Sequence, residues 1–318
     1  MSAKYTIEFN SGGNHGHQLK DYLGGRTIGE LYNLEYIATP YKYLSSFGVV
    51  DPNKKLSKWK RLLHFKKIIR VNGPNWDGFD NYQIFRQHFE NIITCNDDRT
   101  LYVFENALRV HPCQTIAWKQ NKLLKKDVFS IIQNKISSDY YCQKTKPKKL
   151  NSKIRVVMHI NRGQDYDKIK YPEHFSSSKN VRYMFPMSYY AKIINQIQSN
   201  YEDENIEIEI FTEALNSEGI TEKFGNWPGI ELHIGRNRTD IHKTLVSQIF
   251  HSFVDADILV CSNSSFSSVA AYFRKNKTTI YHPHKHLFNL PEPEFIPTSI
   301  NGEIDIGLLP TIQSLNDR

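Results

Sequence analysis

Paired cysteines and long apolar runs are both missing from this sequence. The four cysteines, Cys95, Cys113, Cys142 and Cys261, are scattered and form no C-x-x-C pair, which argues against a disulfide framework or a zinc site. No apolar run approaches the roughly eighteen residues that a membrane span requires. The first residues, MSAKYTIEFNSGG, show no signal-peptide core. We therefore expect a cytoplasmic protein with reduced thiols and no membrane span.

Acidic residues are fewer than basic ones. The chain has 33 Asp and Glu against 41 Lys and Arg, a net charge of +8. This balance favours an anionic partner such as nucleic acid, an acidic surface or a phosphorylated ligand, although solubility alone would also explain it. Hydrophobic residues make up 39% of the 318 residues, which is enough for a buried core and excludes global disorder.

Strand-like and helix-like segments alternate after residue 153. The patterns predict strands at 154–160, 206–212, 230–234, 257–262 and 278–283. They predict helices at 187–201, 239–256 and 269–275. This order is typical of a parallel sheet with helices on both faces.

The first half of the chain begins in the same way. A strand at 5–9, a glycine-rich turn at 11–17 and a helix at 18–34 form the opening of a nucleotide-binding fold. Further strands are predicted at 63–71 and 99–106.

A lysine-rich stretch broken by proline, residues 143–153, is typical of a linker. We therefore predict an α/β protein with two Rossmann-like domains, residues 1–150 and residues 151–318, that face a cleft. No internal repeat of fixed period is present.

Small hydroxyl residues crowd between a predicted strand and a predicted helix in ILVCSNSSFSSVAAYF, residues 258–273. In a parallel sheet the loop after a strand lies at the binding edge. A helix that starts near Ser265 to Ser268 would point its first N–H groups at this edge, where its dipole favours an anion. The stretch is therefore a candidate phosphate site. The simpler alternative is a cluster that only caps a helix, and the residues alone leave both open.

Five segments resemble, in the same order, motifs of the α1,2- and α1,6-fucosyltransferases. They are 12–31 (GGNHGHQLKDYLGGRTIGEL), 156–165 (VVMHINRGQD), 186–197 (PMSYYAKIINQI), 207–215 (EIEIFTEAL) and 255–273 (DADILVCSNSSFSSVAAYF). The resemblance implies a GT-B type glycosyltransferase, with the acceptor side in residues 1–150 and the donor side in residues 151–318. It also implies an inverting reaction without a metal or cofactor, in which an arginine compensates the charge of the departing diphosphate.

The resemblance assigns catalytic roles to two residues near the end of the strand at 154–160. Arg162 would take the diphosphate through its guanidinium. Asn161 stands where the family has the first of two arginines, so either Arg162 has taken over that role or the donor is held differently. Asp165 fits the motif best as the base that takes the acceptor proton. Other candidate bases are Asp21, Asp167, Glu173, His15 and His17.

The same resemblance implies a set of donor-binding residues. His159 lies near the end of one strand and Asn161 follows it. Thr212 ends the next strand and Glu213 follows it, where its carboxylate could accept two N–H bonds from guanine. The remaining donor-binding residues follow the third strand and are Ser264, Ser265, Phe266 and Ser267. Phe266 could equally be core packing.

Two further groups of residues carry chemically active side chains or tight-turn residues. The resemblance places the turn residues Gly13, Asn14, His15 and His17 in the cleft near the transferred sugar, although they could form a tight turn and nothing else. His282, His284 and His286 alternate in YHPHKH and could hold a metal on a strand. Pro283 makes a regular strand doubtful, so no metal site is predicted.

The function that we expect is transfer of a sugar, GDP-fucose being the leading donor, to a hydroxyl of a glycan or glycoconjugate. UDP-xylose and GDP-mannose are alternative donors because the arginine pair is broken. A non-catalytic sugar-binding or nucleic-acid-binding protein is the alternative of another class. The absence of a recognised nucleic-acid module argues against nucleic acid as a partner.

Overall fold

The computed structural model of the chain forms two compact units, Met1–Lys144 and Thr145–Arg318. Each unit contains a parallel β-sheet of its own. The residues that the structure describes are 5–10, 16, 19, 22–23, 26, 34–37, 47–48, 64–72, 91, 100–105, 134, 138, 140, 153–161, 185–201, 205–212, 220–225, 227, 229–234, 243–283, 294–311 and 314.

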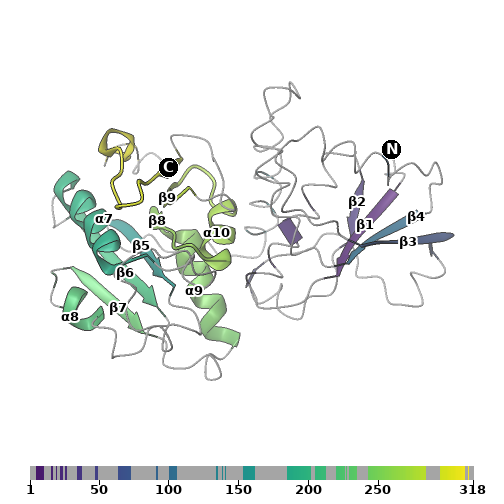
Figure 1. Ribbon diagram of the computed structural model, residues 1–318, viewed down its shortest axis with the longest axis horizontal. Helices are drawn as coiled ribbons and strands as arrows, with labels where there is room; N and C mark the ends of the chain where they lie inside the picture. Colours follow the sequence, from purple (N-terminus) through teal and green to yellow (C-terminus); the bar gives the residue numbers. More distant parts are fainter. Residues whose placement is uncertain are drawn as a thin grey trace. The chain divides into compact units, whose positions relative to one another are not determined.

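The N-terminal unit has a sheet of four strands (Figure 1). In spatial order they are β2 (Glu35–Ile37), β1 (Tyr5–Asn10), β4 (Thr100–Glu105) and β3 (Lys67–Asn72). Every pairing between them is parallel. The structure thus confirms the predicted strands at β1, β3 and β4. It adds β2, which is too short for a recognisable alternation in the sequence.

The predicted first helix is described at only a few positions. Leu19, Tyr22 and Leu23 are helical and buried, as expected for the apolar side of a helix that covers a sheet. The glycine-rich turn itself falls outside the described residues except at Gly16, which is helical and buried.

The C-terminal unit has a six-stranded sheet in the order β10-β9-β8-β5-β6-β7, with every pairing parallel. The strands are β5 (Ile154–Ile160), β6 (Ile206–Thr212), β7 (Ile230–Ile234), β8 (Ile258–Val260), β9 (Thr278–Tyr281) and β10 (Phe295–Pro297). The sequence predicted the first five, with β8 and β9 one to two residues longer at their ends than observed. It did not predict β10.

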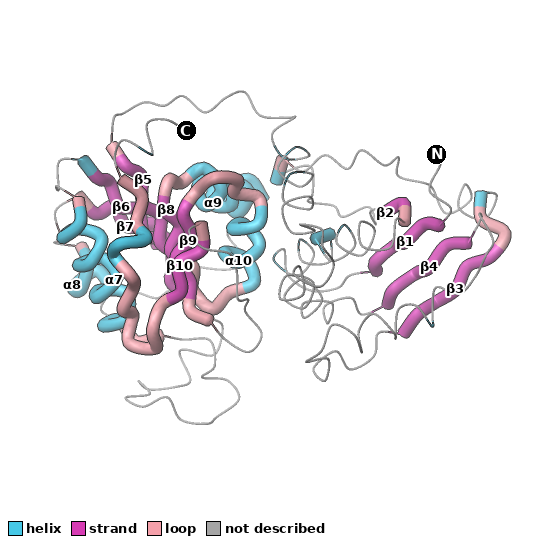
Figure 2. Tube along the Cα trace, turned by 90° about the horizontal axis from the view of Figure 1, so that it is seen from above, coloured by secondary structure: helices cyan, strands magenta, loops and turns pink. Residues whose placement is uncertain are grey.

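Helices cover both faces of this sheet, as predicted (Figures 1 and 2). One face carries α7 (Met187–Asn200) and α8 (Ile220–Phe224), and the other carries α9 (Lys243–Asp255) and α10 (Ser265–Tyr272). The helix α10 begins four residues before the predicted start at residue 269, because Ser264 caps it and the serines are part of its first turns. A short 3₁₀ turn, η8 (Ile306–Leu308), lies near the C-terminus.

Alternation along the strands separates the two faces. In β5, the even-numbered side chains Ile154, Val156, Met158 and Ile160 join the core under α7. The odd-numbered His159 lies on the other face, where its ring centroid is 5.2 Å from that of Phe253 in α9. The period of two along each strand therefore decides which residues meet which helix layer.

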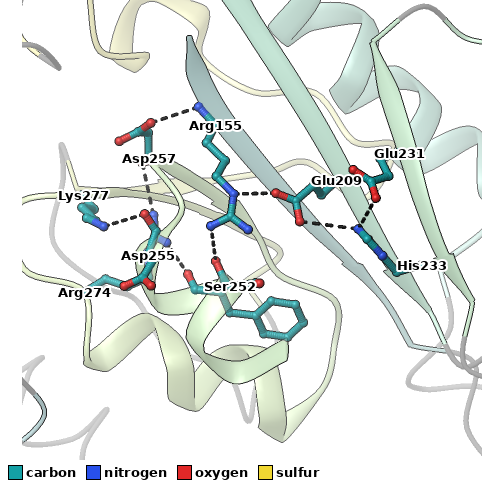
Figure 3. A network of polar contacts seen from close by, with 10 residues as sticks. Arg155, Glu209, Glu231, His233, Ser252, Asp255, Asp257, Arg274 and Lys277 are labelled. Carbon is teal, nitrogen blue, oxygen red and sulfur yellow. Dashed lines mark hydrogen bonds and ion pairs between the residues drawn. The ribbon is translucent and has the colours of Figure 1, made fainter. Parts of the chain in front are cut away.

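A buried arginine connects the end of α9 to the starts of β8 and β9. Arg274 is fully buried and donates hydrogen bonds to the carbonyl oxygens of Phe253, Asp257 (3.1 Å) and Thr278 (2.8 Å). Lys277 Nζ donates to the carbonyl oxygen of Asp255 at 2.7 Å (Figure 3). Two cations thus satisfy carbonyl groups at a helix C-terminus, where the helix dipole favours positive charge.

A second polar link aligns β5 with β8. The amide of Arg155 donates to Asp257 Oδ2, and the amide of Asp257 donates to the carbonyl oxygen of Arg155, both at 2.9 Å. The Arg155 guanidinium bonds Glu209 Oε1 on β6, and His233 Nε2 on β7 lies 3.5 Å from the other oxygen of Glu209 (Figure 3). These contacts join β8, β5, β6 and β7 side by side across the sheet.

We expect Arg274→Met to destabilise the protein by about 3 kcal/mol or more, because the buried carbonyl groups of Phe253 and Thr278 and the partly buried one of Asp257 would lose a charged donor, and each such loss costs about 1–3 kcal/mol. Urea unfolding followed by circular dichroism measures the change. Lys275→Met is the matched control, because Lys275 is the exposed neighbour and should change stability by less than about 0.5 kcal/mol. Equal effects of the two substitutions would contradict the role of Arg274.

Candidate functional site

The order in which strands are added to the sheet changes sides at the boundary between β5 and β8. From β5 the chain continues to β6 and β7 on one side, and it then returns to β8, β9 and β10 on the other side. Parallel α/β sheets bind their ligands at the carboxyl ends of the strands beside such a point, because successive connections leave it toward opposite sides of the sheet. The candidate site is therefore the edge formed by the residues that follow these two strands.

His159 and Ser262 meet at this edge. His159 is the penultimate residue of β5 and is 7% exposed, and Ser262 follows β8 and is 2% exposed. The Ser262 hydroxyl lies 2.9 Å from His159 Nδ1. Ser267 Oγ, which is fully buried in α10, lies 3.5 Å from Ser262 Oγ. A hydroxyl pair thus connects α10 to the imidazole at the end of β5.

The N-terminus of α10 points its first amide groups toward this same loop. Ser264 is the N-cap, with extended backbone angles, and its hydroxyl accepts a hydrogen bond from the Phe266 amide at 3.3 Å. The capping alternative is therefore correct for Ser264. The serines around it differ in role, since Ser262 contacts the histidine, and the Ser267 hydroxyl faces the carbonyl oxygens of Ser262 and Ser264.

Phe266 is part of the packing between α9 and α10. Its ring centroid lies 5.8 Å from that of Phe250, 5.6 Å from that of Phe253 and 6.3 Å from that of His159. Phe253 and Phe266 therefore pack against the imidazole of His159. Phe266 is half-buried and packs against α9, and its contact with a donor stays a prediction.

Further polar residues line the same edge of the sheet. Asn161 directly follows β5 and is partly exposed, whereas Thr212, the last residue of β6, is 5% exposed. Asn263, between Ser262 and the cap, is 7% exposed. Three neighbouring strands therefore end in small polar side chains, which is the composition expected where a polar ligand approaches the backbone closely.

Cys261 and the tyrosines beside it do not supply reactive groups. Complete burial raises the pKa of the Cys261 thiol to about 12, and burial also raises the pKa of Tyr272 well above its usual value. Both groups are therefore protonated at neutral pH. The polar chemistry of this edge rests on hydroxyl groups, imidazole and backbone amides.

His282 occupies a separate position at the carboxyl end of β9. Its ring centroid lies 5.0 Å from that of Phe185, and its Nδ1 lies 3.4 Å from Thr298 Oγ1. Thr298 Oγ1 in turn lies 2.8 Å from the buried hydroxyl of Tyr189. Burial lowers the pKa of His282, and backbone hydrogen bonds with Thr298 and Ser299 only partly oppose this effect.

Several predicted site residues lie outside the described part of the chain. They are Gly13, Asn14, His15, His17, Arg162, Asp165 and Glu213, together with the side chain of Ser265 and with Asp21, Asp167, Glu173, His284 and His286. Of the predicted donor-binding residues, the structure places His159, Asn161, Thr212, Ser264, Phe266 and Ser267 along one edge of the sheet. Their roles toward a donor stay predictions.

The contact between Ser262 and His159 was missed by sequence reasoning. Its only sequence signal is that each residue lies at or just after the end of an apolar strand, and that signal does not state which strands are neighbours. Within the described residues, no group of three or more His, Cys, Asp or Glu side chains is placed to hold a metal ion. No helix in the same part of the chain is both long and apolar enough to cross a membrane.

No protein-family model matches the chain, and no curated protein sequence matches it either. Solved structures do show similarity. The fucosyltransferase FUT1 of Arabidopsis thaliana, a mutant in complex with GDP, is 11% identical, with a TM-score of 0.46, over 92% of this chain and 73% of that one. The fucosyltransferase NodZ from Bradyrhizobium is 9% identical, with a TM-score of 0.45, over 96% and 98%.

The heptosyltransferase WaaC of E. coli, in complex with ADP, is also similar. It is 8% identical, with a TM-score of 0.41, over 98% of both chains. Identities and TM-scores at this level transfer no residue role.

The lowered pKa of His282 predicts an acid-sensitive contribution to stability. The unfolded chain takes up a proton at the ordinary histidine pKa, whereas the folded protein does so only at lower pH, so the stabilisation is present above the unfolded pKa and is lost as the pH falls below it. Between about pH 7 and pH 5, the free energy of unfolding should fall less steeply in His282→Gln than in the wild type.

Urea unfolding at a series of pH values measures the two slopes. His64→Gln is the control, because His64 is exposed on the other unit and should leave the slope unchanged. Parallel curves for His282→Gln and the wild type would show that His282 is not the residue responsible.

Proposed function

We propose that the chain is a glycosyltransferase that binds a nucleotide-sugar donor at the carboxyl edge of the C-terminal sheet and transfers the sugar to a hydroxyl of a glycan or glycoconjugate. The observation that supports this most is the convergence of His159, Ser262 and the capped N-terminus of α10 at the switch point between β5 and β8. Amide groups at a helix N-terminus favour a diphosphate. The N-terminal unit would supply the acceptor side.

The chemistry proposed at this edge needs no metal. Arg162, which comes two residues after the last strand residue of β5, would bind the diphosphate bidentately and offset its growing negative charge as the sugar leaves. Asp165 would take the proton of the acceptor hydroxyl. The reaction would invert the configuration at the anomeric carbon, because the acceptor hydroxyl attacks from the face opposite the departing diphosphate in a single displacement.

GDP-fucose is the proposed donor. Glu213 directly follows Thr212 at the end of β6, and a carboxylate there could accept both N–H groups on one edge of guanine, whereas uracil offers one. Asn161, which occupies the place of the first family arginine, keeps UDP-xylose and GDP-mannose as alternative donors. A sugar-binding protein without turnover is the alternative outside enzymes.

Calorimetric titration of the full chain with GDP and with UDP, in the presence of EDTA, tests the donor class. We expect GDP to bind in EDTA and to bind more tightly than UDP, because Glu213 has two guanine N–H groups to pair with. Tighter binding of UDP would overturn the choice of GDP-fucose but would still support a nucleotide-sugar donor. Absence of binding by both nucleotides would contradict the proposed function.

Two variants test the proposed residue roles. Arg162→Ala should abolish sugar transfer while leaving the circular dichroism spectrum and nucleotide-free stability unchanged, and Arg162→Lys should recover little, because an ammonium cannot form the bidentate contact. Ser265→Ala should weaken nucleotide binding by about 1.5–3 kcal/mol, the usual effect of a lost hydrogen bond to a charged group. Wild-type turnover and affinity in both variants would move the site elsewhere.

A further inference from the structure

β7 forms one margin of the C-terminal sheet. Among the described residues it pairs only with β6 (Figure 1). The carbonyl oxygen of Gly229 accepts a hydrogen bond from the Ile208 amide of β6 at 3.0 Å. Because backbone groups point alternately to the two sides of a strand, the N–H and C=O groups of Ile230, Leu232 and Ile234 point away from β6. Such a row of groups is a template for pairing with another chain.

The turn before β7 uses one of these outward groups. The amide of Ile230 donates to the carbonyl oxygen of Trp227 at 3.3 Å, which agrees with its pointing away from β6. A strand added at this margin would therefore be held through the amides of Leu232 and Ile234 and through the carbonyl groups of Ile230 and Leu232.

The apolar side chains of β7 are incompletely covered. Ile230 and Leu232 pack against the core cluster of the sheet, and both of them, like Ile234, are partly exposed. The three side chains share one face, because every second residue of a strand points to the same side. A further strand beside β7 would remove part of this apolar area from water, which favours association.

The opposite face of β7 carries Glu231 and His233. The side chain of Glu231 is 71% exposed and that of His233 is 35% exposed. The imidazole stacks on the ring of Phe211, with centroids 4.3 Å apart and 12° between the planes. Its Nε2 lies 3.5 Å from a carboxylate oxygen of Glu209 and of Glu231 (Figure 3). One carboxylate and one imidazole therefore lie two residues apart at the same margin of the sheet.

An antiparallel pair of two β7 strands has few possible registers. A twofold axis perpendicular to the sheet places one residue opposite its own copy. With the axis at Leu232, all five residues of the strand are paired, and Ile230 lies opposite Ile234. Glu231 then lies opposite His233. An axis at Glu231 would place two carboxylates opposite each other, which is destabilising, and an axis at His233 would do the same with two imidazoles.

We propose that β7 is a self-complementary edge through which two copies of this chain pair antiparallel, with a twofold axis at Leu232. Each Glu231 then lies opposite the partner's His233. Because the backbone groups of both residues point to β6, they form the non-hydrogen-bonded pairs of the ladder, whose side chains approach most closely. Since only five residues of each copy are paired, we expect a weak, reversible dimer with a micromolar dissociation constant.

Sedimentation velocity of the full chain, over concentrations from nanomolar to high micromolar, measures the equilibrium between monomer and dimer. We expect the wild type to dimerise reversibly as its concentration rises. Glu231→Lys should raise the dissociation constant about tenfold or more, because both cross-strand pairs lose their opposite charges. A wild type that stays monomeric over the whole range, or a dimer that Glu231→Lys leaves unchanged, would overturn the proposal.

Glu35→Lys is the matched control for this charge reversal. Glu35 is an exposed glutamate on β2, which is an edge strand of the other sheet. Its reversal changes the net charge equally and should leave the dissociation constant unchanged. Equal weakening by Glu35→Lys and Glu231→Lys would assign the effect to net charge and contradict the role of β7.

A mixture of two variants tests the register. His233→Glu alone should weaken the dimer, because it places a carboxylate opposite the partner's Glu231. An equal mixture with Glu231→Lys restores an unlike pair at both positions, so we expect the mixture to dimerise more tightly than either variant alone. Circular dichroism checks that both variants are folded. A mixture of folded variants that stays monomeric would overturn the register.

His233→Lys provides a second test that does not introduce a carboxylate beside Glu209. A permanent cation opposite the partner's Glu231 should lower the dissociation constant of the dimer several-fold. An unchanged or higher dissociation constant would contradict the pairing of Glu231 with His233. None of these measurements involves a nucleotide, so a monomeric wild type that binds GDP would overturn the dimer and leave the proposed function standing.

Discussion

The buried guanidinium of Arg274 is the interaction on which the geometry of the candidate site depends. It donates to carbonyl groups at the end of α9, before β8 and at the start of β9. A charged group without solvent must make such bonds, because leaving it unsatisfied costs far more than the net gain of a hydrogen bond. One side chain therefore fixes three elements, and the loop between β8 and α10 has to begin where they place it.

The positions of the polar residues at the carboxyl edge of the sheet depend on this arrangement of α9, β8 and β9. With β8 held beside β5 through Arg155 and Asp257, Ser262 emerges next to His159, and α10 starts beside both. The aromatic cluster of α9 and α10 then occupies the side of the imidazole that faces the helix layer. The site thus combines a rigid apolar support with hydroxyl and amide donors, which is the arrangement that keeps donors oriented before a ligand arrives.

Much of this was predictable where the pattern is local. Ile206–Thr212 alternates apolar and polar residues, and Met187–Asn200 repeats isoleucine and tyrosine every three to four positions, so both elements were predicted within a residue. The predictions failed on short or capped segments. Phe295–Pro297 is too brief for a period. Ser265, Ser267 and Ser268 belong to the helix because Ser264 caps it by accepting a hydrogen bond from the Phe266 amide.

The sequence by itself determined that the C-terminal half is a parallel α/β unit and that small polar residues follow its strands, because periodicity and composition are local properties. Only the tertiary structure decided that β8 lies beside β5, that Ser262 meets His159 across 103 residues, and that Arg274 is buried among backbone carbonyls. These contacts depend on the order of the strands in the sheet. Chain connectivity and packing select that order, and no local sequence pattern encodes it.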